Sequence, residues 1–195
     1  MILHHEGLVE YQDAMAKMQS IHNQAIQDRQ NHLIVCSHPK VFTVGVDDTK
    51  EWSVPTIRTS RGGSITAHSK GQVVLYFCFV VNSPVEFYKK IIRVYKSFFA
   101  SILPQVSYNP KQAGFYIDSR KIASLGFRYS RGVSMHGVAL NVDVDLHFHN
   151  LVAPCGLEGI EATSLKNEGI DISQKEVEQK LISLVEDIFD DSIQT

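Results

Sequence analysis

The sequence of 195 residues predicts a single α+β domain, and three patterns support this fold class. Apolar residues recur at helical spacing near the start, in the middle and at the end of the chain. Short runs of β-branched and aromatic residues lie between these segments, each bounded by turn-forming residues. No internal repeat, low-complexity tract or linker divides the chain. We therefore expect residues 1–195 to form one domain.

The first pattern covers residues 8–30 and predicts an amphipathic helix. One helical stripe carries its apolar side chains, which are Leu8, Tyr11, Met15, Met18 and Ala25. Four β-branched or apolar runs follow and predict strands, at residues 32–37, 41–45, 57–59 and 72–81.

Two adjacent glycines, Gly62 and Gly63, follow Arg61 between the third and fourth of these runs. Glycine adopts positive φ at little cost, so the pair predicts a tight turn with exposed backbone amides. We expect another group to approach this backbone closely.

Capping residues mark the two later helices. Ser83, Pro84 and Glu86 precede apolar residues at helical spacing and predict a core helix from residue 84 to about 103. Ser173 and Glu176 form a second capping box, which begins a closing amphipathic helix. Between the helices, residues 115–144 are rich in strand-forming residues separated by two turns, which is typical of a β-meander.

Composition excludes several classes of protein. The net charge is −2, so no overall basic field favours nucleic acid. Three cysteines without CxxC spacing indicate a reducing compartment. The longest apolar run, residues 73–81, is too short to span a membrane. We expect a cytoplasmic protein that binds neither nucleic acid nor a membrane.

Cys155 is the candidate nucleophile, because Pro154 and Gly156 hold it in a loop of fixed shape after the last strand. A buried, inert cysteine is the alternative, and it suits Cys36 and Cys78, which lie inside apolar strands.

Lys121 follows Arg120 at the start of a strand, a position that usually carries a solvated charge at a sheet edge. Close to a thiol, its ammonium would instead stabilise the thiolate.

The histidines allow both structural and functional interpretations. His147 and His149 alternate on an expected strand, but no third metal ligand is evident, so we predict no metal site. Histidines such as His68 and His136 are more often structural residues with satisfied hydrogen bonds than catalytic residues.

A local charge imbalance lies in residues 111–131. The basic side chains there are Lys111, Arg120, Lys121, Arg128 and Arg131, against the single acid Asp118, which gives a local charge of +4. Such a meander would suit an acidic protein partner.

Three segments resemble the octanoyl-[acyl-carrier-protein]:protein N-octanoyltransferases, the lipoyl(octanoyl) transferase family of lipoate biosynthesis. They are Arg61-Gly-Gly-Ser-Ile-Thr-Ala-His68, Lys121-Ile-Ala-Ser-Leu-Gly126 with residues 131–141, and Pro154-Cys-Gly with Thr163-Ser-Leu165. The resemblance covers roughly residues 35–166. It implies the fold of biotin and lipoate protein ligases, a mixed sheet flanked by helices.

The resemblance also implies residue roles. Cys155 matches the nucleophile that carries the acyl group as a thioester, and Lys121 matches the lysine that lowers the pKa of this thiol and acts as acid and base. Three segments match the acyl-substrate site: Arg61, Gly62, Gly63, Ser64, Ile65, Thr66, Ala67 and His68; Ser124, Leu125 and Gly126; Gly137, Val138 and Ala139.

The partners implied by the resemblance are octanoyl-acyl carrier protein as donor and lipoyl domains as acceptors. These domains belong to the E2 subunits of 2-oxoacid dehydrogenases and to the glycine cleavage H protein. No cofactor is expected, since the carrier thioester is already activated and ATP is not needed.

This chain departs from the family pattern beside His68. Ala67 replaces the usual tyrosine, and Ser69, Lys70 and Gly71 replace Gly-Pro-Gly. Two alternatives remain: an ATP-dependent lipoate or octanoate ligase, which does not require a cysteine at this position, and an acyl-binding module without catalysis.

Overall fold

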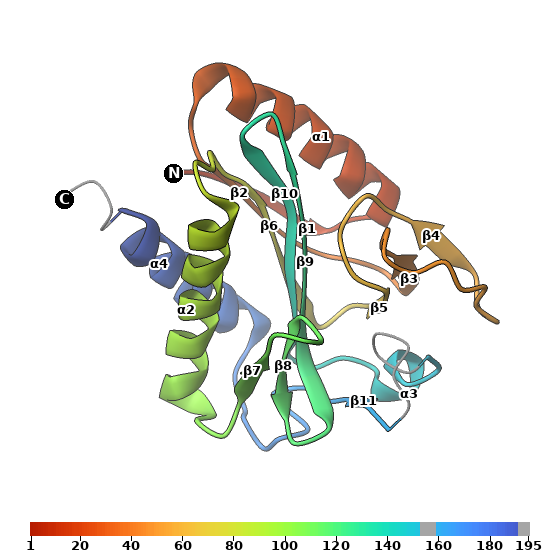
Figure 1. Ribbon diagram of the computed structural model, residues 1–195. Coiled ribbons are helices and arrows are strands. Elements are labelled where there is room, and N and C mark those ends of the chain that lie inside the picture. Colours follow the sequence, from red (N-terminus) through yellow and green to blue (C-terminus); the bar gives the residue numbers. More distant parts are fainter. Residues whose placement is uncertain (153–158, 191–195) are drawn as a thin grey trace.

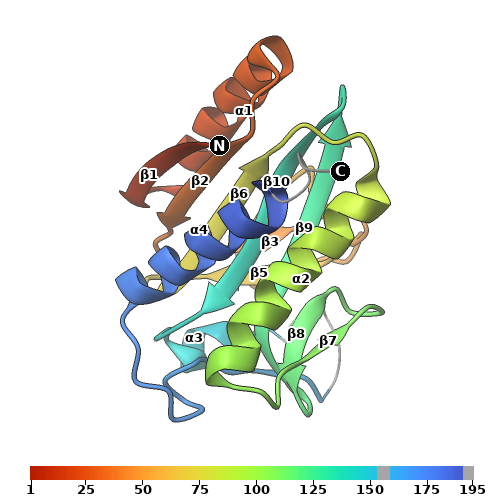
Figure 2. The same cartoon turned by 90° about the vertical axis from the view of Figure 1, so that its left-hand side faces the viewer.

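The computed structural model describes residues 1–152 and 159–190 and has a layered architecture (Figure 1). Within these residues the central layer is a mixed sheet of eight strands. Helices α2 (Pro84–Ile102) and α4 (Gln174–Asp190) cover one face, which Figure 2 views from the front. Helix α1 (Tyr11–Asp28) and a small sheet lie on the other face. The mixed sheet flanked by helices confirms the predicted fold class.

The strands of the large sheet follow a regular order. This order is β1 (Ile2–Leu8), β2 (His32–Ser37), β6 (Gln72–Cys78), β10 (Val133–Asn141), β9 (Arg120–Ser130), β8 (Gly114–Ile117) and β7 (Ser107–Asn109), with β11 (Glu161–Ala162) pairing with β9. The pairs β1–β2 and β11–β9 are parallel, and the others are antiparallel. The small sheet has the order β4 (Thr56–Arg58), β3 (Val41–Val44) and β5 (Ile65–His68). The predicted meander is thus confirmed as β8, β9 and β10.

The two later helices are confirmed with their predicted caps. The Ser83 side chain accepts a hydrogen bond from the Glu86 amide at 3.3 Å, at the start of α2. Before α4, the Glu176 amide donates to Ser173 Oγ at 3.2 Å, and the Ser173 amide donates to Glu176 Oε2 at 3.0 Å. This reciprocal pair satisfies backbone donors that a helix start leaves free.

The prediction that the first helix begins at Leu8 was wrong. Leu8 ends strand β1 and is 57% exposed, and the helix begins at Tyr11. Strand β1 pairs with β2, from Ile2 opposite His32 onward, so its hydrogen-bond partners lie about thirty residues later in the chain. Local periodicity does not show such a partner.

The expected strand around His147 and His149 is also absent from the described residues. Leu146–His149 form the short helix α3, whose N-cap Asp145 accepts from the Phe148 amide at 3.1 Å. His147 is exposed, whereas His149 is buried and lies 2.9 Å from Ser69 Oγ. The two histidines therefore do not share a face.

The two faces of the large sheet have separate cores. Alternate residues of β2, β6, β9 and β10 pack with α2 and α4, including Phe77, Phe127 and Leu140. Residues facing the other way, such as Ile34 and Val74, pack under α1. The core under α1 is smaller, so space remains on that face for the small sheet and for cavities.

Buried histidines lie on the side of the large sheet that carries the small sheet. Burial holds the pKa of His68 well below its usual value, and it lowers the pKa of His136 to about 3 and that of His149 to about 4. Nearby arginines, Arg61 and Arg128, lower the pKa of His136 further. These side chains are therefore neutral in the folded protein at neutral pH.

We expect acid to destabilise the protein through these histidines. Their pKa values are lower in the folded state than in the unfolded state, so unfolding takes up protons below about pH 6.5. Each histidine should lower the free energy of unfolding by up to about 1.4 kcal/mol per pH unit. Urea unfolding at several pH values measures this slope. His149→Gln should make it shallower by one proton, and an unchanged slope would contradict the expectation.

Candidate functional site

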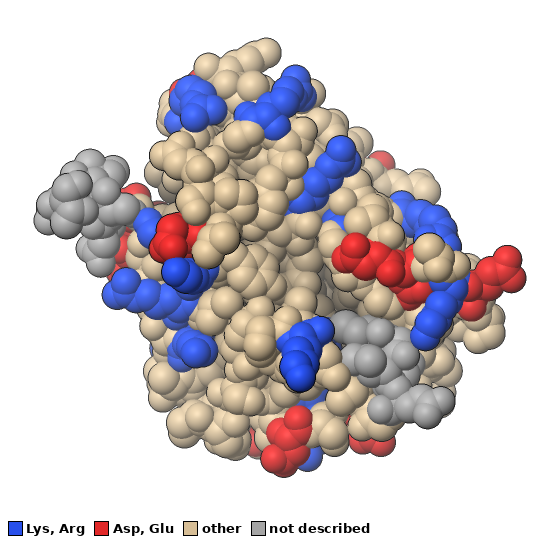
Figure 3. All heavy atoms as spheres, viewed as in Figure 1, with Lys and Arg blue, Asp and Glu red and all other residues tan. Residues whose placement is uncertain are grey.

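Three cavities meet between the large sheet and the small sheet, and Thr66 and Ser124 line all three. We call them the slot, the branch and the mouth. The slot reaches Tyr76, the branch reaches His149, and the mouth reaches Lys111. The empty space, including the part open to solvent, is about 350 Å³ in the slot and about 850 Å³ in the mouth. Figure 3 shows the surface hollowed between the central strands and the small sheet.

The floor of the slot is made by residues with little or no side chain. Gly126 of β9 and Gly137 of β10 are a cross-strand pair, and Ala139 follows on β10. A Cβ atom on Gly137 would lie 1.9 Å from the Leu75 carbonyl oxygen, and one on Gly126 would lie 3.0 Å from that of Gly62. Close backbone packing therefore requires glycine at position 137 and leaves little room for a side chain at position 126.

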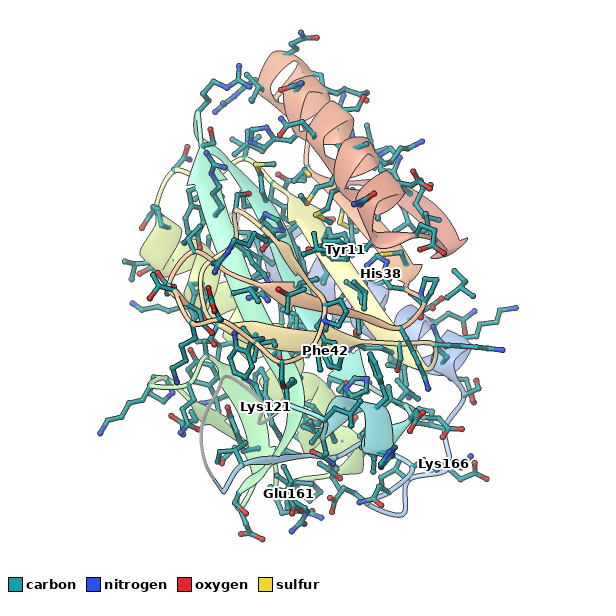
Figure 4. All side chains as sticks on the ribbon, turned by 90° about the vertical axis from the view of Figure 1, so that its right-hand side faces the viewer. Tyr11, His38, Phe42, Lys121, Glu161 and Lys166 are labelled. Atoms are coloured by element: carbon teal, nitrogen blue, oxygen red, sulfur yellow. The ribbon has the colours of Figure 1, made fainter. Side chains whose placement is uncertain are left out.

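Aromatic side chains close the far end of the slot. The ring of Tyr11 lies 5.1 Å from that of His38 and 5.6 Å from that of His68. His38 Nε2 is 2.8 Å from the Tyr76 hydroxyl. Burial raises the pKa of Tyr11 to about 12 and that of Tyr76 well above its usual value, so both phenols stay protonated. Figure 4 shows Tyr11 and His38 beside each other, above Lys121.

His136 is strained and lines the slot. Its φ of 62° is left-handed, which is uncommon for a non-glycine residue and rarer still within a strand. Its Nε2 lies 2.9 Å from Ser60 Oγ, whereas its buried Nδ1 has no hydrogen-bond partner among the described residues.

A β-bulge turns Lys121 toward the cavities. Lys121 and Ser124 are three residues apart, so a regular strand would point them to opposite faces. The pairing of β8 with β9 shifts here: Tyr116 lies opposite Lys121, but Phe115 lies opposite Ala123, and Ile122 is extra. The bulge restores the alternation, and both Lys121 and Ser124 line the branch and the mouth.

The Lys121 side chain is buried, with only 3% of the residue exposed. Its Nζ donates to the Gln112 carbonyl oxygen at 3.1 Å and lies 5.4 Å from the centre of the Tyr116 ring. Gly114 makes room for it, since a Cβ atom there would lie 2.5 Å from Lys121 Cε. On the other side, the Thr163 amide donates to the Lys121 carbonyl oxygen at 2.9 Å.

The glycine turn packs against the protein. The Gly62 amide donates to the Phe127 carbonyl oxygen at 3.0 Å, and the Gly63 amide donates to Asp47 Oδ2 at 2.5 Å. A Cβ atom on Gly45 would lie 2.2 Å from the Gly63 carbonyl oxygen. The close approach predicted for this turn is thus made by the chain itself, and the expected exposed amides of Gly62 and Gly63 are already hydrogen-bonded.

Most residues expected to bind substrate line one of the three cavities. These are Arg61, Gly63, Ser64, Ile65, Thr66, Ala67, His68, Ser124, Leu125, Gly126, Gly137, Val138 and Ala139. Gly62 lines none of the three and instead supports the turn. The expected nucleophile, Cys155, lies outside the described residues.

Sequence reasoning missed several lining residues. Tyr11 of α1, Val74 and Tyr76 of β6, and Gln112 before β8 also line the cavities. Val74 and Tyr76 alternate with core residues on β6, which indicates that they share a face. Nothing in the sequence around Tyr11 or Gln112 signals a place in this site.

The basic segment does not form one exposed patch. Arg120 makes two hydrogen bonds to the Glu168 carboxylate, at 2.9 and 3.1 Å, and Lys121 is buried. Lys111 is exposed at the mouth, whereas Arg131 lies in the turn between β9 and β10 and donates to Asn23. Figure 3 shows basic side chains scattered over this face. Of the five basic side chains expected to attract an acidic partner, Lys111, Arg128 and Arg131 are thus exposed, and docking at this segment stays a prediction.

Among residues 1–152 and 159–190, no group of three His, Cys, Asp or Glu side chains is arranged to hold a metal ion. No helix in this part of the chain is long and apolar enough to cross a membrane.

Known proteins resemble this chain in sequence and in fold. The family model for the lipoyl protein ligase A/B catalytic domain matches residues 10–186. An octanoyltransferase of Chromobacterium violaceum is 31% identical over 95% of this chain and 94% of its own length. One of Pseudomonas putida is 35% identical over 90% and 86%.

Two solved structures share the fold at low sequence identity. The bipartite lipoate protein ligase of Thermoplasma acidophilum, studied with its E2 lipoyl domain, aligns with a TM-score of 0.70 at 16% identity, over 97% of this chain and 84% of that chain. The biotin protein ligase of Leishmania major aligns at 0.58 and 13%, over 97% and 75%. The sequence matches show that this chain belongs to the lipoyl protein ligase A/B catalytic domain family, among its octanoyltransferases.

Proposed function

We propose that this octanoyltransferase carries the octanoyl group as a thioester on Cys155 while it moves from acyl carrier protein to a lysine of a lipoyl domain, with Lys121 as the acid and base. The observation that carries the proposal is the place of Lys121. It is a buried ammonium at the junction of two cavities, turned there by a β-bulge. Lysine side chains are rarely fully buried without a reason, so such burial favours a chemical role.

The first half-reaction exchanges one thioester for another. In the proposed resting state the Cys155 proton has passed to Lys121, which is the ammonium, and the Cys155 thiolate attacks the acyl carbonyl carbon. The bond from that carbon to the pantetheine sulfur then breaks, and the Lys121 ammonium protonates the departing sulfur. Acyl-carrier thioester and cysteine thiol give acyl-cysteine and carrier thiol, so no ATP is consumed.

The second half-reaction forms an amide. The acceptor lysine amine attacks the acyl-cysteine carbonyl, Lys121 takes a proton from the nitrogen, and the Cys155 sulfur leaves and recovers that proton. An amide is more stable than a thioester, so this step makes the overall transfer favourable.

The slot fits the acyl chain. Its floor of Gly126, Gly137 and Ala139 leaves space for methylenes, and Thr66 and Ser124 connect it to the cavities that Lys121 lines. Burying about seven methylenes contributes on the order of 5 kcal/mol. One methylene more or less changes this modestly, so polar closure of the slot by Tyr11 and Tyr76 would add selectivity against longer chains.

The mouth suits the carrier's pantetheine arm and the acceptor lysine, which would use it in turn. It carries the exposed Lys111, whose charge would attract an acidic carrier protein. The two acceptor classes are lipoyl domains of 2-oxoacid dehydrogenase E2 subunits and the glycine cleavage H protein. Such a reaction belongs in the cytoplasm.

An ATP-dependent ligase is the second candidate on this fold. Its support is structural likeness at 16% identity or below, which bears on the fold alone. The octanoyltransferases are 31% and 35% identical over most of the chain, so they favour transfer from a carrier.

Incubation with octanoyl-acyl carrier protein, without an acceptor, should give an octanoyl adduct on Cys155. A carrier and a folded acceptor cannot easily reach one cavity together, so the acyl group must wait on the enzyme. Intact-protein mass spectrometry should find a hydroxylamine-labile adduct, which Cys155→Ala abolishes. Cys36→Ala and Cys78→Ala should keep it, since both residues are buried and burial raises the pKa of each thiol. A Cys155→Ala protein that still carries the adduct would refute the thioester.

Lys121→Met should slow both half-reactions by about 100-fold or more, because each loses its acid and base. Methionine keeps most of the side-chain volume but removes the ammonium that lies over the Tyr116 ring. Rapid-quench measurement of adduct formation and decay separates the two steps. If only one half-reaction is slowed, Lys121 is not the acid and base of the other half-reaction.

Lys111→Glu should raise the KM for acyl carrier protein and weaken its dependence on salt, since an attractive charge at the mouth becomes repulsive. Arg131→Glu makes the same change of charge at the far hairpin turn and is the matched control. Equal effects of the two variants would place carrier docking away from the mouth.

A further inference from the structure

A chain of buried hydrogen bonds connects the small sheet to Lys121. It begins at Arg61, whose NH2 donates to Thr43 Oγ1 at 2.9 Å. Thr43 Oγ1 lies 3.2 Å from His68 Nε2, and His68 Nδ1 lies 2.8 Å from Gln72 Oε1. The Arg61 guanidinium cannot accept a hydrogen bond, so it fixes the first donor of the chain.

The second half of this series of hydrogen bonds lies on the large sheet. Gln72 Nε2 donates to Asn141 Oδ1 at 2.9 Å, and Asn141 Nδ2 donates to the Thr163 carbonyl oxygen at 2.8 Å. The Thr163 amide in turn donates to the Lys121 carbonyl oxygen. Gln72, Asn141 and Thr163 are each at most 6% exposed, so water does not readily replace these bonds.

Every donor in this chain points the same way. The Gln72 amide nitrogen also donates to the Ala67 carbonyl oxygen at 3.3 Å, so Gln72 Oε1 faces His68 and accepts the hydrogen of Nδ1. Neutral His68 then has no hydrogen on Nε2, which accepts from the Thr43 hydroxyl. Reversing one amide would bring two acceptors together.

We infer that Gln72 and Asn141 are positioning residues for the proposed transfer: they hold the Thr163 main chain against Lys121 and so fix where its ammonium group lies. This inference rests on the proposed function. Lys121 precedes a bulge, where the ladder with β8 is interrupted, so its backbone depends more on the partner strand β11. Asn141 holds the segment that follows β11 at two points, since its carbonyl oxygen also accepts from the Leu165 amide at 3.1 Å.

Asn141→Asp tests the last link of the chain with almost no change of volume. The carboxylate offers the Thr163 carbonyl oxygen an acceptor where the amide offered a donor, so Thr163 and Lys121 should shift. We expect kcat to fall by about 100-fold, because a misplacement of about 1 Å has effects of this size, with little change in the KM for acyl carrier protein.

Gln72→Glu tests the donor-to-acceptor direction of the hydrogen bonds at a residue that does not itself contact Thr163. An ionised carboxylate accepts from both sides, so the Asn141 amide must turn toward it and no longer donates to Thr163. A protonated carboxyl donates again. The groups around this position are His68 and, beyond it, His38, Arg61 and His149, with Lys121 across the branch. We therefore expect the deficit in kcat relative to the unmodified protein to shrink as the pH is lowered, whereas simple destabilisation would grow in acid.

Asn31→Ala is the matched control. Asn31 Oδ1 accepts a hydrogen bond from the Val80 amide at 2.9 Å, which is also an asparagine contact to the main chain. Val80 bridges to Val133, at the opposite end of β10 from Asn141. This variant should lower the melting temperature as Asn141→Asp does, and leave kcat unchanged.

A readout independent of acyl transfer separates the two proposals. The rate of Cys155 alkylation by iodoacetamide, followed against pH, should shift to higher pH in Asn141→Asp and stay unchanged in Asn31→Ala, since thiolate formation depends on Lys121. The positioning role is overturned if Asn141→Asp and Gln72→Glu keep the kcat and alkylation profile of the unmodified protein, or lose no more than Asn31→Ala. If no octanoyl adduct forms on the unmodified protein while the alkylation profile still shifts, the proposed function fails and the positioning role stands.

Discussion

The constraint on which the site depends is the burial of one ammonium group. Moving a charge out of water costs several kcal/mol unless polar groups replace the water. The Lys121 ammonium donates a hydrogen bond to the Gln112 carbonyl oxygen and lies over the face of the Tyr116 ring. A glycine at position 114 leaves room for its side chain, and the bulge directs it to the cavities. Strands β8, β9 and β11 thus have the local geometry that this one side chain requires.

The small sheet is held by both apolar packing and hydrogen bonding. Phe42 of the small sheet stacks on Phe148 of helix α3, with ring centres 4.4 Å apart, whereas Thr43, His68 and Gln72 are hydrogen-bonded in series between the two sheets. Apolar side chains in contact can shift slightly against each other, but a series of hydrogen bonds forms only when each donor lies opposite its own acceptor. The hydrogen bonds therefore specify how the small sheet sits over the slot.

Residue patterns predicted those parts of the fold that depend on neighbours in sequence. Capping residues placed the helices that begin at Pro84 and Gln174 within about a residue, because a cap is a local interaction. Strand β1 and the direction of the Lys121 side chain were not predictable in this way. Strand β1 forms by pairing with the distant strand β2, and a β-bulge in β9 directs the Lys121 side chain. Burial of Lys121 contradicted the usual reading of a charged strand end, and only the motif resemblance pointed to it.

The glycines at positions 126 and 137 give the slot an unusual mechanical property. Each brings one stretch of main chain against another, so part of its boundary is backbone rather than side chain. Side chains yield by changing rotamer, but hydrogen-bonded strands at close packing have low compressibility. The width of the slot is accordingly stiff, and changes of sequence alter its depth more readily, through the residues at its far end such as Tyr11 and Tyr76. Relatives with different acyl preferences would then differ mainly in where the slot stops.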